Sequence, residues 1–141
     1  MSDSPSRVLA ELLHQHDQLR DNIYRCEKLA DALDAGQVEP LVVLSEVARL
    51  RVLFDMHNKF EERLLRPILR DADAFGEVRI DRMVADHVDE HREMGEGLGS
   101  PITSELRHTL EQLKRHLATE ERYFLSSRVL REDIVVVEGG G

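Results

Sequence analysis

The stretch His57–Leu65 reads HNKFEERLL, and the same order of residues returns at His116–Phe124 as HLATEERYF. In both stretches a histidine is followed, after three residues, by a pair of glutamates and an arginine. Residues four apart lie one turn apart on the same face of an α-helix, so the histidine and the first glutamate of each stretch point the same way. The repeat therefore predicts two helices that each present an imidazole and a carboxylate on one side.

Clusters of glycine and proline divide the chain into four pieces. They lie at residues 34–40, 70–77 and 95–101. Between them, and on to about residue 130, apolar residues recur at the spacing of one helix face. Four helices joined by short connections predict an all-α fold, an antiparallel up-down-up-down four-helix bundle. We expect the bundle to occupy residues 1–130, and residues 131–141 to form an extended or flexible tail.

Four residues predict where these helices begin and end. Ser4 can cap the first helix, because a serine oxygen accepts hydrogen bonds from the backbone N–H groups of a first turn. Pro40 and Pro101 stand where later helices begin, and proline is favoured at a first helical position. Pro67 falls inside the second helical pattern, so we expect it to end or kink that helix near its last turn.

Composition limits the kinds of function. A chain of 141 residues, 41% hydrophobic and 33% charged, suits one soluble globular domain. The net charge of −9 argues against binding to nucleic acid or to an anionic membrane. The sequence begins without the pattern of a secretory signal, and no apolar run reaches the roughly 20 residues that span a bilayer. The single cysteine, Cys26, fits a reducing compartment, and we expect a cytoplasmic protein.

The position of each histidine and glutamate around its helix axis, its helical phase, predicts whether it faces the interior or the surface. Residues three or four positions from a core leucine, isoleucine or phenylalanine share its face of the helix. His14, His108, Glu62 and Glu121 fall among charged residues, and we expect them to face solvent. The line of core apolar residues along one face of each predicted helix forms an apolar stripe. Seven polar residues, contributed by all four predicted helices, fall on these stripes: His16, His57, Glu61, His87, His91, His116 and Glu120.

Seven inward polar side chains would be costly in an apolar core. A buried carboxylate without a partner loses much of its solvation energy or changes its pKa. Two divalent cations would compensate the carboxylates and bind the imidazoles, since imidazole suits iron, zinc, copper and nickel. The stripes therefore predict a two-metal site inside the bundle.

The motifs HQHDQLR, HNKFEE, HVDEH and HLATEE together resemble those of the hemerythrin HHE cation-binding family. The resemblance extends over residues 8–127. It implies a four-helix bundle around two iron ions, Fe²⁺ or Fe³⁺, which are joined by an oxo or hydroxo bridge and by two carboxylates.

The resemblance also implies a role for each predicted ligand. One iron would take His16 and His57, the other would take His87, His91 and His116, and Glu61 and Glu120 would bridge them. The oxygen carriers of this family have an aspartate five residues after the last histidine, so Glu121 is an alternative bridge to Glu120. Tyr24 and Tyr123 are candidate hydrogen-bond donors to the centre or alternative ligands.

We therefore expect a non-haem di-iron protein that binds or senses O2, NO or peroxide rather than turning over a substrate. An iron-storing or iron-oxidising protein of the ferritin type is an alternative, but such sites use Glu-x-x-His on two helices, and the pair Glu105–His108, which has this spacing, lies off the apolar face. A helical interaction module with a structural metal is a second alternative. The β-branched run Ile134–Val137 is either a frayed terminus or a segment that docks on another subunit or partner.

Overall fold

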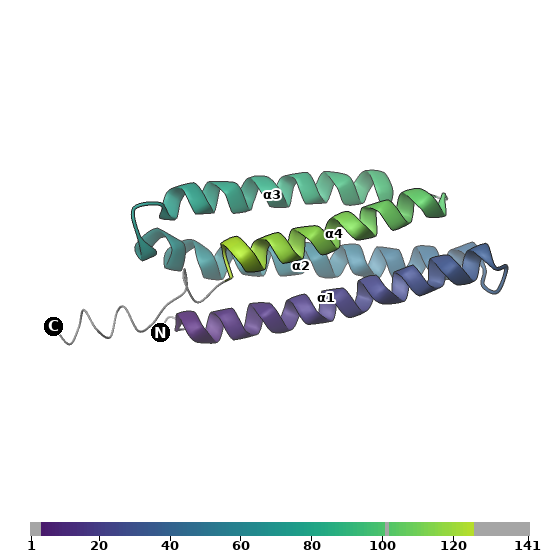
Figure 1. Cartoon of the computed structure of the whole chain (residues 1–141), viewed down its shortest axis with the longest axis horizontal. Coiled ribbons are helices and arrows are strands. Elements are labelled where there is room, and N and C mark those ends of the chain that lie inside the picture. Colours follow the sequence, from purple (N-terminus) through teal and green to yellow (C-terminus); the bar gives the residue numbers. More distant parts are fainter. Residues whose placement is uncertain (1–3, 101, 126–141) are drawn as a thin grey trace.

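Four helices form the whole of the described fold. The structure is a computed structural model that describes residues 4–100 and 102–125. The helices are α1 (Pro5–Asp34), α2 (Pro40–Ala72), α3 (Gly76–Gly97) and α4 (Thr103–Tyr123). Each runs back along the one before it, and α1 and α3 each pack against both α2 and α4 (Figure 1). The prediction of an all-α, up-down-up-down four-helix bundle is confirmed.

The helix boundaries agree with most of the expected signals. The backbone N–H of Arg7 donates to Ser4 Oγ at 3.4 Å, so Ser4 caps α1, and Pro40 is the first residue of α2. Between them, Gly36 has a φ of 71°, a left-handed conformation that glycine adopts without a steric penalty.

Pro67 does not end α2, which continues through it to Ala72. Proline removes one backbone hydrogen bond from a helix, and the kink that this loss predicts at Pro67 stays a prediction. Pro101, the domain boundary at residue 130 and the tail with Ile134–Val137 lie outside the described residues.

Two apolar clusters fill the bundle, and a polar layer separates them along every helix. On α1, for example, His16 lies between Leu12 of one cluster and Leu19 of the other. Burial of each leucine contributes about 1.5–3 kcal/mol, so the two clusters offset the cost of burying the polar layer. That layer consists of His16, His57, Asn58, Glu61, His87, Glu90 and Glu120.

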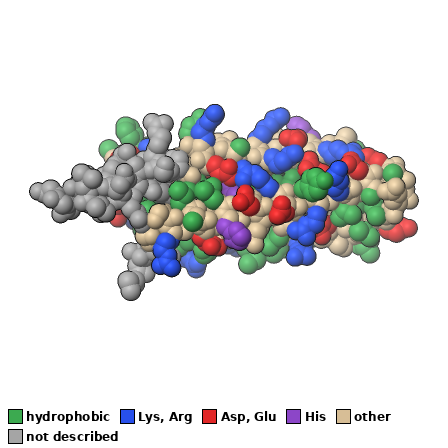
Figure 2. Space-filling model, turned by 60° about the horizontal axis from the view of Figure 1, so that its bottom comes forward, with side chains coloured by type: hydrophobic (Ala, Val, Ile, Leu, Met, Phe, Trp, Pro, Cys, Tyr) green, Lys and Arg blue, Asp and Glu red, His purple; other side chains and the backbone are tan. Residues whose placement is uncertain are grey.

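The surface is charged and mixed in sign. On the face shown in Figure 2, acidic and basic side chains are interspersed along the bundle, with small apolar patches between them. Of the helices in residues 4–100 and 102–125, none is both long and apolar enough to cross a membrane.

Candidate metal centre

Four of the predicted ligands converge at the middle of the bundle. His16, His57, Glu61 and Glu120 each offer one donor atom, and these atoms all lie within 4.8 Å of one another. All four side chains are buried, and each comes from the polar layer of α1, α2 or α4. His87 of α3 adds a fifth group, because its Nε2 lies 3.0 Å from Glu61 Oε1.

Two histidines and one carboxylate oxygen form a compact triangle on one side of the centre. The Nε2 atoms of His16 and His57 are 3.1 Å apart. Glu61 Oε2 lies 3.0 Å from His57 Nε2 and 3.5 Å from His16 Nε2. Ligand atoms bound to one ion at right angles, with bonds of about 2.1 Å, are about 3 Å apart. The triangle therefore has the size of one face of a metal coordination sphere.

Both inner carboxylates divide their oxygens between two sides of the centre. Glu61 directs Oε2 to His16 and His57, and Oε1 to His87. Glu120 does the same at longer range, because its Oε2 lies 3.9 Å from His16 Nε2 and its Oε1 lies 3.6 Å from His87 Nε2. We refer below to the His16 side and the His87 side of the centre.

The outer edges of the imidazoles are held by acceptors. Nδ1 of His57 lies 2.7 Å from Gln15 Oε1, and Nδ1 of His16 lies 2.8 Å from Glu121 Oε2. Because a carboxylate or an amide oxygen can only accept, Nδ1 of each ring carries the proton and donates it. The unprotonated Nε2 of each ring then faces the centre, in the tautomer that binds a metal.

The second glutamate of each pair is not the solvent-facing residue that the helical phase predicted. Glu62 and Glu121 are both about a quarter exposed, at 26% for each side chain. Glu121 holds His16, and Glu62 Oε1 lies 3.4 Å from Nδ1 of His87. Each pair therefore contacts both edges of an imidazole from another helix, with its first glutamate inside and its second outside.

Two predicted ligands face away from the centre, so the prediction that they are inward is wrong. His91 is exposed, and its Nδ1 lies 3.1 Å from Asp55 Oδ1 on the outer edge of α2 and α3. His116 is half-buried at the boundary of α3 and α4, where its Nε2 lies 3.0 Å from Glu93 Oε2.

The two tyrosines also lie at the surface. Tyr24 is 58% exposed and Tyr123 is 52% exposed, and their rings lie near Lys28 and Arg82. His14 and His108 are exposed, as expected. The structure therefore gives neither tyrosine a contact with the described residues of the centre.

The helical phase missed one buried carboxylate, Glu90. It is fully buried on α3, and its Oε1 accepts a hydrogen bond of 2.8 Å from Asn58 Nδ2 of α2. Glu90 lies three residues after His87, whereas His91 lies four after it, and both spacings fit one face of a helix. Only the packing of α3 decides between them, and it turns Glu90 inward.

Electrostatics within the centre favour a cation. Burial opposes ionisation of Glu61, but its contacts with Glu120 and the imidazoles lower its pKa well below the usual range. Burial and the charge of Glu61 raise the pKa of Glu120 well above the usual range. Both oxygens of Glu120 are buried without a hydrogen bond. A bound cation would stabilise such a group, so the residues present fit a metal centre.

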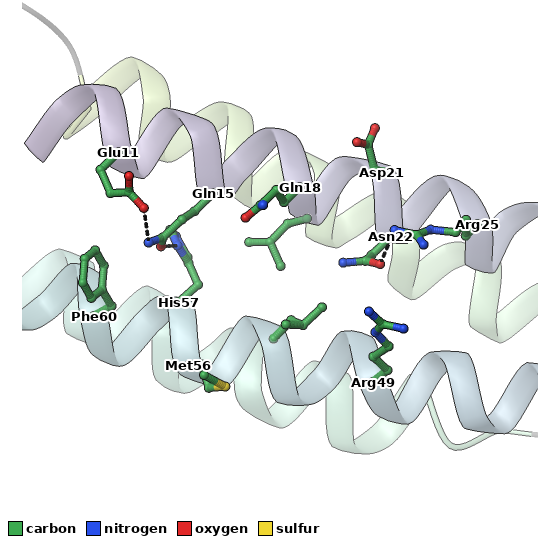
Figure 3. Close-up of a pocket in the computed structure, with 12 residues that line it drawn as sticks. Glu11, Gln15, Gln18, Asp21, Asn22, Arg25, Arg49, Met56, His57 and Phe60 are labelled. Carbon is green, nitrogen blue, oxygen red and sulfur yellow. Dashed lines mark hydrogen bonds between the residues drawn. The ribbon is translucent and has the colours of Figure 1, made fainter. Parts of the chain in front are cut away.

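A groove between α1 and α2 reaches the outer edge of the centre. It has a cavity volume of about 570 Å³. Figure 3 shows Gln15 and His57 in contact near one end of the groove, close to Phe60, with Arg25 and Arg49 near the other. The hydrogen bond between Gln15 and His57 therefore lies between the groove and the buried donors.

Comparison with known proteins agrees with this geometry. The family model of the hemerythrin HHE cation binding domain matches residues 7–127, which include every residue of the centre. No curated protein and no solved structure gives a match. A helical bundle whose buried histidines and glutamates converge on one point has the donors that a cation-binding domain requires. The chain belongs to the hemerythrin HHE cation-binding domain family.

Proposed function

We propose that this chain is a non-haem di-iron protein that binds or senses O2, NO or peroxide at a carboxylate-bridged centre. One observation carries the proposal: Glu61 and Glu120 each direct one oxygen to the His16 side and the other to the His87 side. A carboxylate with an oxygen on each side can join two metal ions. The division of both carboxylates therefore supports two ions rather than one.

The chain contributes donors of fixed orientation. On the His16 side, Gln15 and Glu121 hold the outer edges of His57 and His16, so both Nε2 atoms face inward. On the His87 side, Glu62 has the corresponding position at Nδ1 of His87. Iron bound between these groups would supply Lewis acidity and one-electron redox chemistry to a small molecule.

The surroundings of the centre suit a small, weakly polar ligand. Phe54 and Leu117, each one turn from an inner ligand, are fully buried in the adjoining apolar cluster. Such walls exclude bulk water and hydrated ions more strongly than they exclude O2 or NO. The groove beside His57 gives a small molecule an approach from the α1–α2 surface.

The setting of the protein forms part of the proposal. Cys26 is a buried free thiol on α1, and an unpaired cysteine suits a reducing compartment. We therefore propose a cytoplasmic location, and a role in binding or sensing rather than in turnover.

Metal content and the visible spectrum test the proposal. The protein purified from iron-replete cells should contain close to two irons per chain. Its spectrum should change when the reduced protein meets air or NO. His57→Ala should lower the iron content sharply, whereas His14→Ala, an exposed site on α1, should not change it.

Other metal contents would decide against the proposal. Fewer than one transition metal per chain would remove the two-metal centre. Two zinc ions per chain, with no spectral response to air or NO, would favour the interaction module with a structural metal.

A further inference from the structure

The two sides of the metal centre differ in the number of donors. On the His16 side, two imidazoles face Glu61 Oε2. On the His87 side, a single imidazole faces Glu61 Oε1, at 3.0 Å, because the two other predicted histidines lie outside the polar layer. The His87 side therefore offers fewer donor atoms, although Glu61 and Glu120 each direct one oxygen to it.

A third buried carboxylate lies on the same helix face as His87. Glu90 is 0% exposed and follows His87 by one turn of α3. Asn58 Nδ2 donates to its Oε1 at 2.8 Å, and its Oε2 is buried without a hydrogen-bond partner. A buried carboxylate oxygen without a partner is costly, so its retention in the core calls for a compensating group.

The hydrogen bond from Asn58 places Glu90 beside the part of α2 that carries Glu61. Glu90 is buried one turn after His87 on α3, and Asn58 lies three residues before Glu61 on α2. Glu61, Glu90 and Glu120 are the buried carboxylates of residues 4–100 and 102–125. Glu90 is thus the one among them that the bridging arrangement does not already use.

We propose that Glu90 is a ligand of the metal ion on the His87 side, and that Asn58 is its positioning residue. Asn58 occupies Oε1 of Glu90 and leaves Oε2 for the ion. This inference rests on the proposed function, and it changes the donor set. The centre has three imidazoles and three carboxylates, from His16, His57, His87, Glu61, Glu90 and Glu120.

A third carboxylate changes which metal ion, and which oxidation state of that ion, the centre prefers. Carboxylate oxygen is a harder donor than imidazole and suits iron and manganese. Its added negative charge stabilises Fe³⁺ relative to Fe²⁺ by direct electrostatic attraction. The His87 side should therefore hold the ferric state more firmly than a side that is completed by histidines.

Titration of the metal-depleted full-length chain with Co²⁺ tests the assignment, because the visible bands of Co²⁺ report its ligands. The wild-type chain should bind two ions. In Glu90→Gln the first ion should bind as in the wild type, and the second should bind at least about tenfold more weakly. Glu93→Gln is the matched control on α3, because Glu93 is half-buried and bonded to His116 outside the centre. The Glu93→Gln variant should bind both Co²⁺ ions as the wild type does.

The melting temperature of the metal-depleted chain separates a ligand from a merely structural residue. If Glu90 serves only to link α2 and α3 through Asn58, Glu90→Leu should melt at a lower temperature, because it removes the acceptor of the Asn58 hydrogen bond, and should keep both metal-binding steps. If Glu90 is a ligand, both Glu90→Leu and Glu90→Gln should weaken the second step. Glu90→Gln, which keeps an acceptor for Asn58, should then melt at an unchanged or higher temperature, because a buried carboxylate charge is removed.

The outcomes distinguish this inference from the proposed function. Two equally tight ions in both the wild type and Glu90→Gln would overturn the role of Glu90 and leave the di-metal centre standing. A wild-type chain that binds no ion would overturn both. If Glu90→Gln does not fold, Asn58→Ala applies the same test, because it keeps the carboxylate but removes its hydrogen bond. An unchanged second step in Asn58→Ala would then overturn the assignment.

Discussion

Oε2 of Glu121 lies 2.8 Å from Nδ1 of His16, on the edge of the imidazole that faces away from the buried centre. Arg20 holds the same oxygen at 2.7 Å. Although burial opposes ionisation, Arg20 and His16 lower the pKa of Glu121, so it stays an anion and a strong acceptor. The second glutamate of HLATEERYF therefore orients a buried histidine of the centre from outside.

Glu121→Gln should weaken metal binding by about 10- to 100-fold, because His16 loses the charged acceptor that fixes its tautomer. Competition with a chelator of known affinity measures this loss. Glu62→Gln is the comparison, since its contact with His87 is longer, at 3.4 Å, and its effect should be smaller. Equal affinities in the wild type and Glu121→Gln would contradict an orienting role.

The two inner glutamates should differ in the metal-depleted protein. Glu61 Oε1 is the acceptor for Nε2 of His87, so Glu61→Leu leaves that buried nitrogen without a hydrogen-bond partner and should destabilise the fold by about 1–3 kcal/mol. Glu120 has no hydrogen bond to either oxygen, so Glu120→Leu should leave stability unchanged or raise it. Denaturant unfolding measures both changes, and both variants should lose metal. Equal destabilisation by the two substitutions would contradict these contacts.

Histidine substitutions should follow the observed burial rather than the sequence pattern. His91→Ala and His116→Ala remove contacts with Asp55 and Glu93 at the edge of the bundle, and should keep most of the metal. His16→Ala removes a buried donor and should lose metal sharply. Metal analysis of the three purified variants measures this, and a loss in His91→Ala as large as in His16→Ala would show that α3 rotates when metal binds.

Gly97 marks a close approach of α3 and α4. A Cβ at this position would overlap Oγ1 of Thr109 on α4. Gly97→Ala should therefore separate the two helices locally and destabilise the protein by about 1–3 kcal/mol. Gly99→Ala is the control, because a Cβ at Gly99 would meet no other atom within 4 Å. Thermal unfolding of the two variants measures the difference, and similar melting temperatures would argue against this tight packing.

The thiol of Cys26 should resist alkylation until the bundle opens. Burial raises its pKa to about 12 from a usual value of 9.0, so the folded chain keeps it protonated. At pH 8 the reaction with a thiol reagent should be slow in the folded protein and fast in denaturant. Since the unfolded thiol ionises first as the pH rises, stability should fall above pH 9.0, and Cys26→Ala should lack this part of the fall.

Part of the polar layer was predictable because helical periodicity is a local property. Positions seven apart return to nearly the same face, so His87 shares one face of α3 with Ile80 and Met94, and all three are buried. The same regularity placed Glu120 rather than Glu121 inside α4, seven residues after Leu113.

The sequence did not allow a prediction of which residue is buried between His87 and Met94 on α3. After His87, the next core position can be three or four residues on, and these choices differ by about 100° around the helix axis. The sequence has a metal-ligating side chain at both, Glu90 and His91. It has apolar residues at both Met83 and Val84, one turn earlier, so the pattern gives no preference. We assigned His91 to the interior, and the structure buries Glu90 instead.

The sequence by itself determined the four helices, their antiparallel order and the inward direction of His16, His57, Glu61, His87 and Glu120. These follow from the glycine and proline clusters that interrupt the helices, and from the spacing of apolar residues, which can be read in each helix separately. Only the tertiary structure decided the rotation of α3, the outward position of His116 and the contact of Glu121 with His16. A helix can turn about its axis without changing its own hydrogen bonds, so its rotation is set by packing against neighbours from distant parts of the chain.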